Sequence, residues 1–298
     1  MKKQLRAGYI ALGLVSFLWG TTYIASRVGA QHMPGLFVAG LRQFSAGLIM
    51  VTFFLARGYK IPDRQSLKRI SIQGILLLCL ANGMLTWSLE YITGGLAAII
   101  AALVPILITV FSILLLKHAR FTKLMVIGLL VGFAGVIVIF SDYLQQFTNA
   151  SFAFGVGLAV LSTISWAFGS VYGSGKKLPV DILFNVGLQM LIAGVVMLVI
   201  CGFSGKYVNP VHAGVASWYA LLYLIVFGSL IAYSAYVFAI SKLPPALVSI
   251  YAYINPIVAV GLGWMLLNER MNGNMLLGTL ITLGGVFLVN REFKKQIA

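Results

Sequence analysis

The sequence predicts an all-α integral membrane protein, with ten transmembrane helices arranged as two inverted five-helix repeats around a central cavity. Three observations lead to this fold. Of the 298 residues, 60% are hydrophobic and only 9% are charged, against about 25% charged in an ordinary soluble protein. The apolar residues form ten stretches of roughly membrane-spanning length. The second half of the chain repeats the pattern of the first half.

The composition excludes several classes of protein. With so few charges a soluble fold could not cover its apolar surface, so most of the chain must lie against lipid or against other membrane helices. This argues against a soluble enzyme, a disordered protein and a disulfide scaffold. A cleaved signal peptide is a weaker interpretation of the N-terminus, because its apolar run is too long and nine further runs follow.

Charges and Pro-, Gly- or Asn-rich breaks separate the ten apolar stretches. A helix needs about 20 apolar residues to cross the hydrocarbon core of a bilayer. We place the helices at residues 8–27, 35–56, 70–90, 94–115, 124–141, 153–174, 181–203, 216–239, 246–267 and 274–290. Short connectors at 91–95 and 241–245 separate the third helix from the fourth and the eighth from the ninth.

The basic residues predict the orientation of the chain. There are 21 Lys and Arg residues against 6 Asp and Glu residues, a net charge of +15. With the N-terminus inside, 17 of the 21 fall on the cytoplasmic side, three fall outside, and Arg42 lies within a helix. Because Lys and Arg in short loops favour the cytoplasm, we expect both termini to be cytoplasmic. The positive charge then needs no nucleic-acid partner.

The two halves carry related motifs. Residues 104–116 (VPILITVFSILLL) resemble residues 255–267 (NPIVAVGLGWMLL), and residues 128–135 match residues 278–285 at an offset of 150. Trp19 matches Trp166 near the start of each half. We therefore divide the chain into repeats at residues 1–147 and 148–298. Since five helices is an odd number, the second repeat must be inverted in the membrane, as in many secondary transporters.

The second half ends on the pattern Pro256…Leu267-Asn268-Glu269-Arg270…Gly278…Gly284-Gly285-Val286. It resembles the signature that closes each EamA repeat in the drug/metabolite transporter superfamily, and residues 18–21, 41–44 and 88–93 are similar to the same family. Residues 117–120 (KHAR) depart from it where a Glu-Arg-like pair is frequent, which weakens any role for two symmetric glutamates. The resemblance implies a ten-helix carrier of the bacterial inner membrane that exports amino acids, other metabolites or drugs.

Two prolines mark the predicted substrate site. Pro105 and Pro256 lie near the middle of the fourth and ninth helices, where each removes an amide donor and frees the carbonyl four residues earlier. Matched interruptions in two inverted halves point to a binding site in transporters. A kink that serves packing alone is an equal alternative.

Aromatic and amide side chains at membrane depth complete the predicted site. Trp19 and Trp166 lie too far from the helix ends to be interfacial anchors. An amide at this depth needs a partner, either a neighbouring helix or a ligand. The predicted substrate-binding residues are Trp19, Asn82, Trp87, Trp166, Tyr233, Tyr251 and Asn255, with Tyr223, Tyr236 and Tyr253 as weaker candidates.

Few ionisable residues approach the membrane. Arg42, Glu90 and Glu269 are candidates for gating or coupling; a structural role for Arg42 and ordinary loop roles for the glutamates are the alternatives. No Asp or Glu lies near the centre of a predicted helix, and all three histidines lie in loops. Proton-coupled carriers usually need an Asp, Glu or His side chain inside the membrane. A facilitator and a carrier coupled through Glu90 or Glu269 both remain open.

The sequence therefore predicts a secondary transporter of the inner membrane. It would export a small metabolite such as an amino acid, or a drug-like compound, by alternating access. A passive channel is the alternative, and an intramembrane enzyme fits less well because clustered acids, histidines or cysteines are lacking. We expect no catalytic residue, metal or cofactor. The expected partners are a small-molecule substrate, the lipid bilayer and a second copy of the chain, packed through the fifth and tenth helices.

Overall fold

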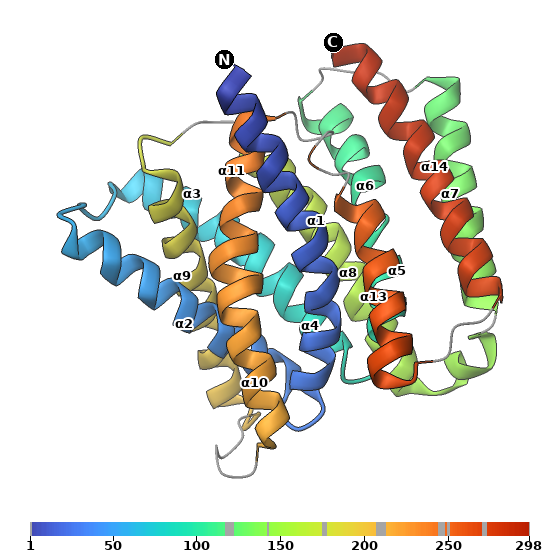
Figure 1. Ribbon diagram of the computed structural model, residues 1–298, viewed down its shortest axis with the longest axis horizontal. Coiled ribbons are helices and arrows are strands. Elements are labelled where there is room, and N and C mark those ends of the chain that lie inside the picture. Colours follow the sequence, from blue (N-terminus) through green and yellow to red (C-terminus); the bar gives the residue numbers. More distant parts are fainter. Residues whose placement is uncertain are drawn as a thin grey trace.

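The computed structural model describes residues 2–116, 122–141, 143–174, 178–206, 213–243, 248, 251–269 and 273–297. Every regular element in these residues is helical (Figure 1). Seven helical segments are long and apolar enough to cross a membrane, and three shorter apolar helices accompany them at Lys123–Ile139, Ile254–Leu267 and Gly273–Val289. The predicted class, an all-helical membrane protein, is confirmed.

The first half of the chain begins with two unbroken helices, α1 (Lys2–Ala30) and α2 (Gly35–Ala56). A composite segment follows, made of α3 (Arg64–Gly74), the π-helix η1 (Ile75–Gly83) and α4 (Met84–Ser88). The next segment joins α5 (Gly94–Ala101), α6 (Val104–Phe111) and the π-helix η2 (Ser112–Leu116). Helix α7 (Lys123–Ser141) closes this half, and the short 3₁₀-helix η3 (Leu144–Thr148) leads onward.

The second half has a similar order. It contains α8 (Ala150–Ser174), α9 (Ile182–Phe203), a composite segment of α10 (Val215–Tyr223), the π-helix η5 (Leu224–Tyr233) and α11 (Ser234–Lys242), then α13 (Tyr251–Leu267) and α14 (Gly273–Ile297). The predicted helix bounds agree with these to within a few residues, with α1, α3 and α14 extending further. Of the residues discussed above, 117–120, His212, 244–247, 249–250, Arg270 and the side chain of Tyr253 lie outside the described residues.

Side-chain caps explain where several helices begin. Asp63 accepts hydrogen bonds from the amides of Gln65 and Ser66 at the start of α3, and the bonds with Ser66 hold the pKa of this exposed carboxyl below its usual value. Asp181 caps α9 in the same way. Thr93 accepts from the amide of Leu96 and so starts α5 directly after α4 ends. These polar groups satisfy amides that a helix leaves unpaired at its first turn.

Helices α2 and α9 pack side by side (Figure 1). A methyl group on Gly47 of α2 would overlap the backbone of Leu191, and one on Gly194 of α9 would overlap the backbone of Phe44. Small residues of this kind let two membrane helices approach closely. The pair forms one side of the molecule.

Helices α7 and α14 form the opposite side in the same manner (Figure 1). A methyl group on Gly285 would overlap the backbone nitrogen of Gly132 and lie 2.5 Å from the carbonyl oxygen of Gly128. A methyl group on Gly135 would lie 2.6 Å from the carbonyl oxygen of Gly278, and one on Gly278 would lie 2.6 Å from that of Gly135. The remaining segments lie between the two pairs, and both ends of the chain lie at the same end of the molecule.

Candidate functional site

A cavity lies at the centre of the molecule, between segments from both halves of the chain. Its volume is about 80 Å³, which exceeds the space that a single water molecule needs. Its walls are apolar and aromatic, with a few polar groups. The lining residues are Trp19, Thr22, Tyr23, Arg42, Gln43, Leu78, Ala81, Asn82, Leu85, Ala98, Ala101, Val104, Ser162, Thr163, Trp166, Gly228, Tyr233, Tyr251, Ala252 and Asn255.

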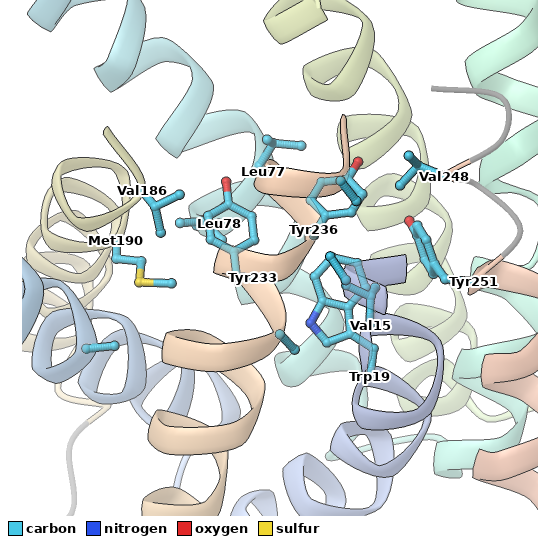
Figure 2. Packing of buried hydrophobic residues seen from close by; sticks show 14 of the residues in the cluster. Val15, Trp19, Leu77, Leu78, Val186, Met190, Tyr233, Tyr236, Val248 and Tyr251 are labelled. Carbon is cyan, nitrogen blue, oxygen red and sulfur yellow. The ribbon is translucent and has the colours of Figure 1, made fainter. Parts of the chain in front are cut away.

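Five rings form an aromatic cluster, made of Trp19, Trp166, Tyr233 and Tyr251 in the cavity wall and Tyr236 packed against them. The Trp19 ring lies 5.2 Å from that of Trp166 and 5.0 Å from that of Tyr251, both nearly at right angles. Tyr236 lies 4.9 Å from Trp19 and 5.3 Å from Trp166. These are favourable edge-to-face and tilted arrangements. Figure 2 shows Trp19, Tyr236 and Tyr251 close together, with Tyr233 further toward Leu78 and Val186.

Two π-helices border the cavity. Asn82 lies in η1 and Tyr233 in η5, and each of these wide turns interrupts an otherwise α-helical segment. The two turns occupy matching places in the two halves, at an offset close to 150 residues. π-Helical turns inside α-helices are frequent at functional sites. Here each turn presents cavity-lining residues, among them Leu78 and Gly228.

A polar chain runs along one wall of the cavity and joins both halves. The Nε of Arg42 donates to the Ser229 hydroxyl at 2.8 Å, and that hydroxyl donates to the Gln43 amide oxygen at 3.3 Å. The Gln43 amide nitrogen in turn donates to Oδ1 of Asn82 at 3.1 Å. The sequence predicted that Asn82 needs either a neighbouring helix or a ligand as its partner; Gln43 on α2 is one such partner, and a ligand in the cavity stays a prediction.

The indole nitrogens of the two cavity tryptophans differ in their surroundings. Nε1 of Trp19 donates to the carbonyl oxygen of Gly228 at 3.4 Å. Nε1 of Trp166 is buried and makes no hydrogen bond of good geometry, although the hydroxyls of Tyr236 and Tyr251 lie nearby. Since an indole N–H is a donor only, these two hydroxyls are the acceptors that lie beside it.

The two prolines act differently. Helix α5 ends at Ala101 and α6 begins at Val104, so Pro105 stands in the first turn of a new helix. Helix α13 instead continues through Pro256, so the amide hydrogen that proline lacks is missing from inside this helix. When the oxygen and nitrogen of its side-chain amide are exchanged, Asn255 donates hydrogen bonds to the carbonyl oxygens of Ser16 and Tyr251, each at 3.1 Å.

Glu90 and Glu269 lie away from the cavity and hold helix ends together. The Glu269 carboxylate, just beyond α13, accepts hydrogen bonds from the amides of Gly94 at 3.0 Å and Gly95 at 3.3 Å, at the start of α5. Glu90 accepts from the amide of Gly35 at the start of α2. Both carboxylates therefore meet the positive end of a helix dipole, where a negative charge is stabilised.

Six of the seven predicted binding residues line the cavity, and Arg42 lines it too. Trp87 is not among the lining residues: its ring packs against Phe154 at 5.3 Å and beneath the ammonium of Lys206 at 4.3 Å. The reason is helical geometry, since Leu85 lines the cavity and a residue two further along points about 200° away. Tyr223, a weaker candidate, bonds to Thr21 at 2.6 Å.

The cavity also contains residues that the sequence did not single out. Thr22 and Tyr23 lie one turn after Trp19, and Ser162 and Thr163 lie one turn before Trp166. The spacings i+3, i+4, i−4 and i−3 place them on the same helix faces as the tryptophans. Helical periodicity applied to the two tryptophans was the signal that could have identified them.

Comparison with known proteins gives a consistent result. The profile of the EamA-like transporter family matches residues 6–141 and 153–291. The uncharacterized inner membrane transporter YedA of Escherichia coli (strain K12) is 36% identical over 271 residues, 91% of this chain and 86% of that protein. The uncharacterized transporter YvbV of Bacillus subtilis (strain 168) is 29% identical over 97% of this chain and 93% of that protein.

The fold is also known from experiment. A solved crystal structure, 19% identical in sequence, matches with a TM-score of 0.69 over 98% of this chain and 99% of that one. This likeness concerns the fold alone. The family profile, by contrast, covers both halves of the sequence, and a relative above 30% identity spans nearly all of it. The chain therefore belongs to the EamA-like transporter family, within the drug/metabolite transporter superfamily.

Proposed function

We propose that this protein is a secondary transporter of the bacterial inner membrane, which exports a small organic solute such as an amino acid, or a drug-like compound, by alternating access. In this proposal ten transmembrane helices form two inverted repeats, residues 1–147 and 148–298, with both termini in the cytoplasm. The observation that carries it is the central cavity, lined from both halves and walled by the aromatic cluster. Such a midplane site between repeats is typical of secondary transporters.

Reciprocal contacts support the inverted repeat. In the α2–α9 pair, Gly47 meets Leu191 and Gly194 meets Phe44. The offset between Trp19 and Trp166 is 147 residues. The same offset relates Gly47 to Gly194 and Phe44 to Leu191. The residue that corresponds to Gly47 therefore contacts Phe44, which corresponds to Leu191. A two-fold axis relates the contacts of a symmetric dimer in the same way.

The α7–α14 pair follows the same rule at an offset of 150. Gly128 meets the carbonyl oxygen of Gly285, and Gly135 meets that of Gly278. Because residues 128 and 135 correspond to 278 and 285, the two contacts again exchange. Two helix pairs on opposite sides of the cavity therefore support one pseudo-two-fold axis through it.

The glutamate contacts support a closed gate at one end. Glu269 joins α13 of the second half to α5 of the first, and Arg27 of α1 donates to the carbonyl of Leu89 beside Glu90. These bonds lie between segments that line the cavity, so opening this end requires breaking them. We place this gate on the extracytoplasmic side, because the loops rich in Lys and Arg, which favour the cytoplasm, lie at the other end.

Counterflow in proteoliposomes tests the proposal. The purified protein is reconstituted with an internal excess of each unlabelled amino acid in turn, and uptake of the same labelled compound is measured with and without a pH gradient. We expect transient accumulation of at least one compound, since a carrier exchanges bound solute across the membrane. A passive channel would give no counterflow, and an enzyme would return an altered product.

Variants of the aromatic cluster show whether the cavity is the transport site. We expect Trp19→Ala and Trp166→Ala each to slow counterflow by at least ~10-fold, because each loses several ring contacts worth about 0.5–1.5 kcal/mol apiece. Trp264→Ala is the matched control, since its side chain is 57% exposed on the outside of α13. Unchanged counterflow in both cavity variants would refute the site assignment.

A further inference from the structure

Arg42 is a buried cation whose charge is not balanced by any group that the structure describes. Its side chain is only 3% exposed and lines the cavity. Its Nε donates to Ser229, and the four N–H groups on its two terminal nitrogens make no hydrogen bond within the described residues. Of the six acidic residues, the five in the described part make no ion pair with it; the ion pair found there joins Lys295 to Glu292.

Such a group is costly in a membrane protein. A charged side chain away from water is expensive unless an opposite charge or good hydrogen bonds compensate it. Glu90 and Glu269, the two carboxylates that the sequence made candidates for gating or coupling, are engaged at the N-terminal ends of α2 and α5. Within the described residues no carboxylate compensates Arg42, so a negatively charged group in the cavity it lines would do so.

The guanidinium is held in a defined place beside the aromatic cluster. A methyl group on Gly228 would lie 2.6 Å from Nη2 of Arg42, so the guanidinium rests against this side-chain-free part of η5. The carbonyl of the same glycine accepts the hydrogen bond from Nε1 of Trp19. Arg42 and Trp19 are thus adjacent in the wall, and a ligand of a few atoms can touch both.

The two parts of the cavity favour different ends of a ligand. A guanidinium presents planar N–H donors that match the two oxygens of a carboxylate. Aromatic ring faces carry partial negative charge, so they repel an anion and favour an apolar group or a cation.

We propose that Arg42 anchors the carboxylate of the transported solute, and that the solute is a small amphipathic carboxylate whose apolar or cationic end lies against the aromatic cluster. Zwitterionic amino acids with apolar side chains fit this description, whereas drugs that carry only positive charge do not, because Arg42 repels them. The inference rests on the proposed transport function and narrows its substrate class.

Matched pairs of ligands test the carboxylate directly on the wild-type protein. We would titrate apolar amino acids and the corresponding amino-acid amides into detergent-solubilised protein, and follow the fluorescence of the tryptophans and the thermal unfolding temperature. Each amide keeps the side chain and the ammonium but lacks the negative charge. We expect the carboxylate form of at least one pair to bind ~10-fold or more tightly, as charge-assisted hydrogen bonds require. Equal binding, preference for amides, or no binding by any carboxylate overturns the proposal.

The variant Arg42→Gln tests whether Arg42 binds the carboxylate. In this variant we expect the ratio of amide to carboxylate dissociation constants to fall to about 1. Arg42→Lys keeps the charge without the planar fork and should retain part of the preference. Trp264→Ala is the control, since its side chain is 57% exposed on the outside of α13; its ratio should stay near that of the wild type.

A stability measurement separates an anchor from a structural residue. Without ligand, Arg42→Gln should unfold at a higher temperature than the wild type, because an uncompensated buried charge is removed. A lower unfolding temperature would mark Arg42 as structural and contradict the proposal. Competition by inorganic phosphate as strong as that by amino acids would also contradict it, since it would show a site for inorganic anions.

Failure of this inference is distinct from failure of the proposed function. Counterflow of neutral or cationic solutes with unaltered Arg42→Gln activity would leave the transporter in place and remove the carboxylate anchor. Absence of counterflow with every solute, together with carboxylate-selective binding, would keep the anchor and argue against transport.

Discussion

Tyr233 faces the cavity with its ring, but its hydroxyl points out of the aromatic cluster. The hydroxyl donates to the amide oxygen of Gln189 at 2.6 Å, and that amide donates to Gln73 and Asn185. Gln189 has no exposed surface. The ring and the hydroxyl of one residue therefore serve different purposes: the ring belongs to the site, and the hydroxyl satisfies a buried amide between η5, α9 and α3.

We expect Tyr233→Phe to reduce stability and leave transport nearly unchanged. Removing the hydroxyl leaves a buried acceptor on Gln189 unsatisfied, which costs about 1–3 kcal/mol. Thermal unfolding in detergent measures the loss, and counterflow rates should stay within about twofold. Tyr219→Phe is the control, because that side chain is 71% exposed on α10. A large drop in counterflow without loss of stability would place the hydroxyl in the substrate site instead.

For single residues, the depth of a side chain within its helix was the informative signal. Trp19 and Trp166 lie well inside α1 and α8, and both line the cavity. Depth does not determine the face of a helix, and Trp87 lies outside the cavity lining. Nor does it identify partners: the polar chain of Arg42, Ser229 and Gln43 joins residues nearly 190 positions apart, and no local pattern encodes that contact.

At the scale of elements, the helix bounds followed from apolar length and from breaks in the sequence, whereas the winding inside the helices did not. The run at residues 70–90 reads as one helix, yet it contains the π-helix η1. In the structure η1 packs against α8 and α9, which lie far from it in the sequence. The sequence likewise predicted matched interruptions at Pro105 and Pro256, but only α5 and α6 are separated.

We expect Gly285→Ala to destabilise the contact between α7 and α14. A methyl group there overlaps the backbone of α7, and overpacking of this kind costs roughly 1–3 kcal/mol. Gly284→Ala, at the neighbouring position, meets nothing within 4 Å and should leave the unfolding temperature unchanged or slightly higher. Thermal unfolding of the two variants in detergent makes the comparison. Equal effects would argue against close packing at residue 285.

At the scale of the whole molecule, the outer faces of α7 and α14 are strongly apolar. Phe133 and Leu130 on α7, and Leu280 and Phe287 on α14, are each more than half exposed. The sequence predicted that a second copy of the chain packs here, and this stays a prediction, because lipid tails would cover the same side chains equally well. The orientation in the membrane is likewise predicted by the basic loops, and it can be tested directly.

The connectors after α2 and after α9 are equivalent in the two repeats, so inversion places them on opposite sides of the membrane. Lys60 and Lys206 are exposed side chains in these connectors. In a background where the buried Cys79 and Cys201 are replaced by alanine, we expect a membrane-impermeant maleimide to label Lys206→Cys in intact cells. Lys60→Cys should react only after the membrane is permeabilised. Labelling of both positions from the same side would refute the inverted repeat, and the reverse pattern would place the termini outside.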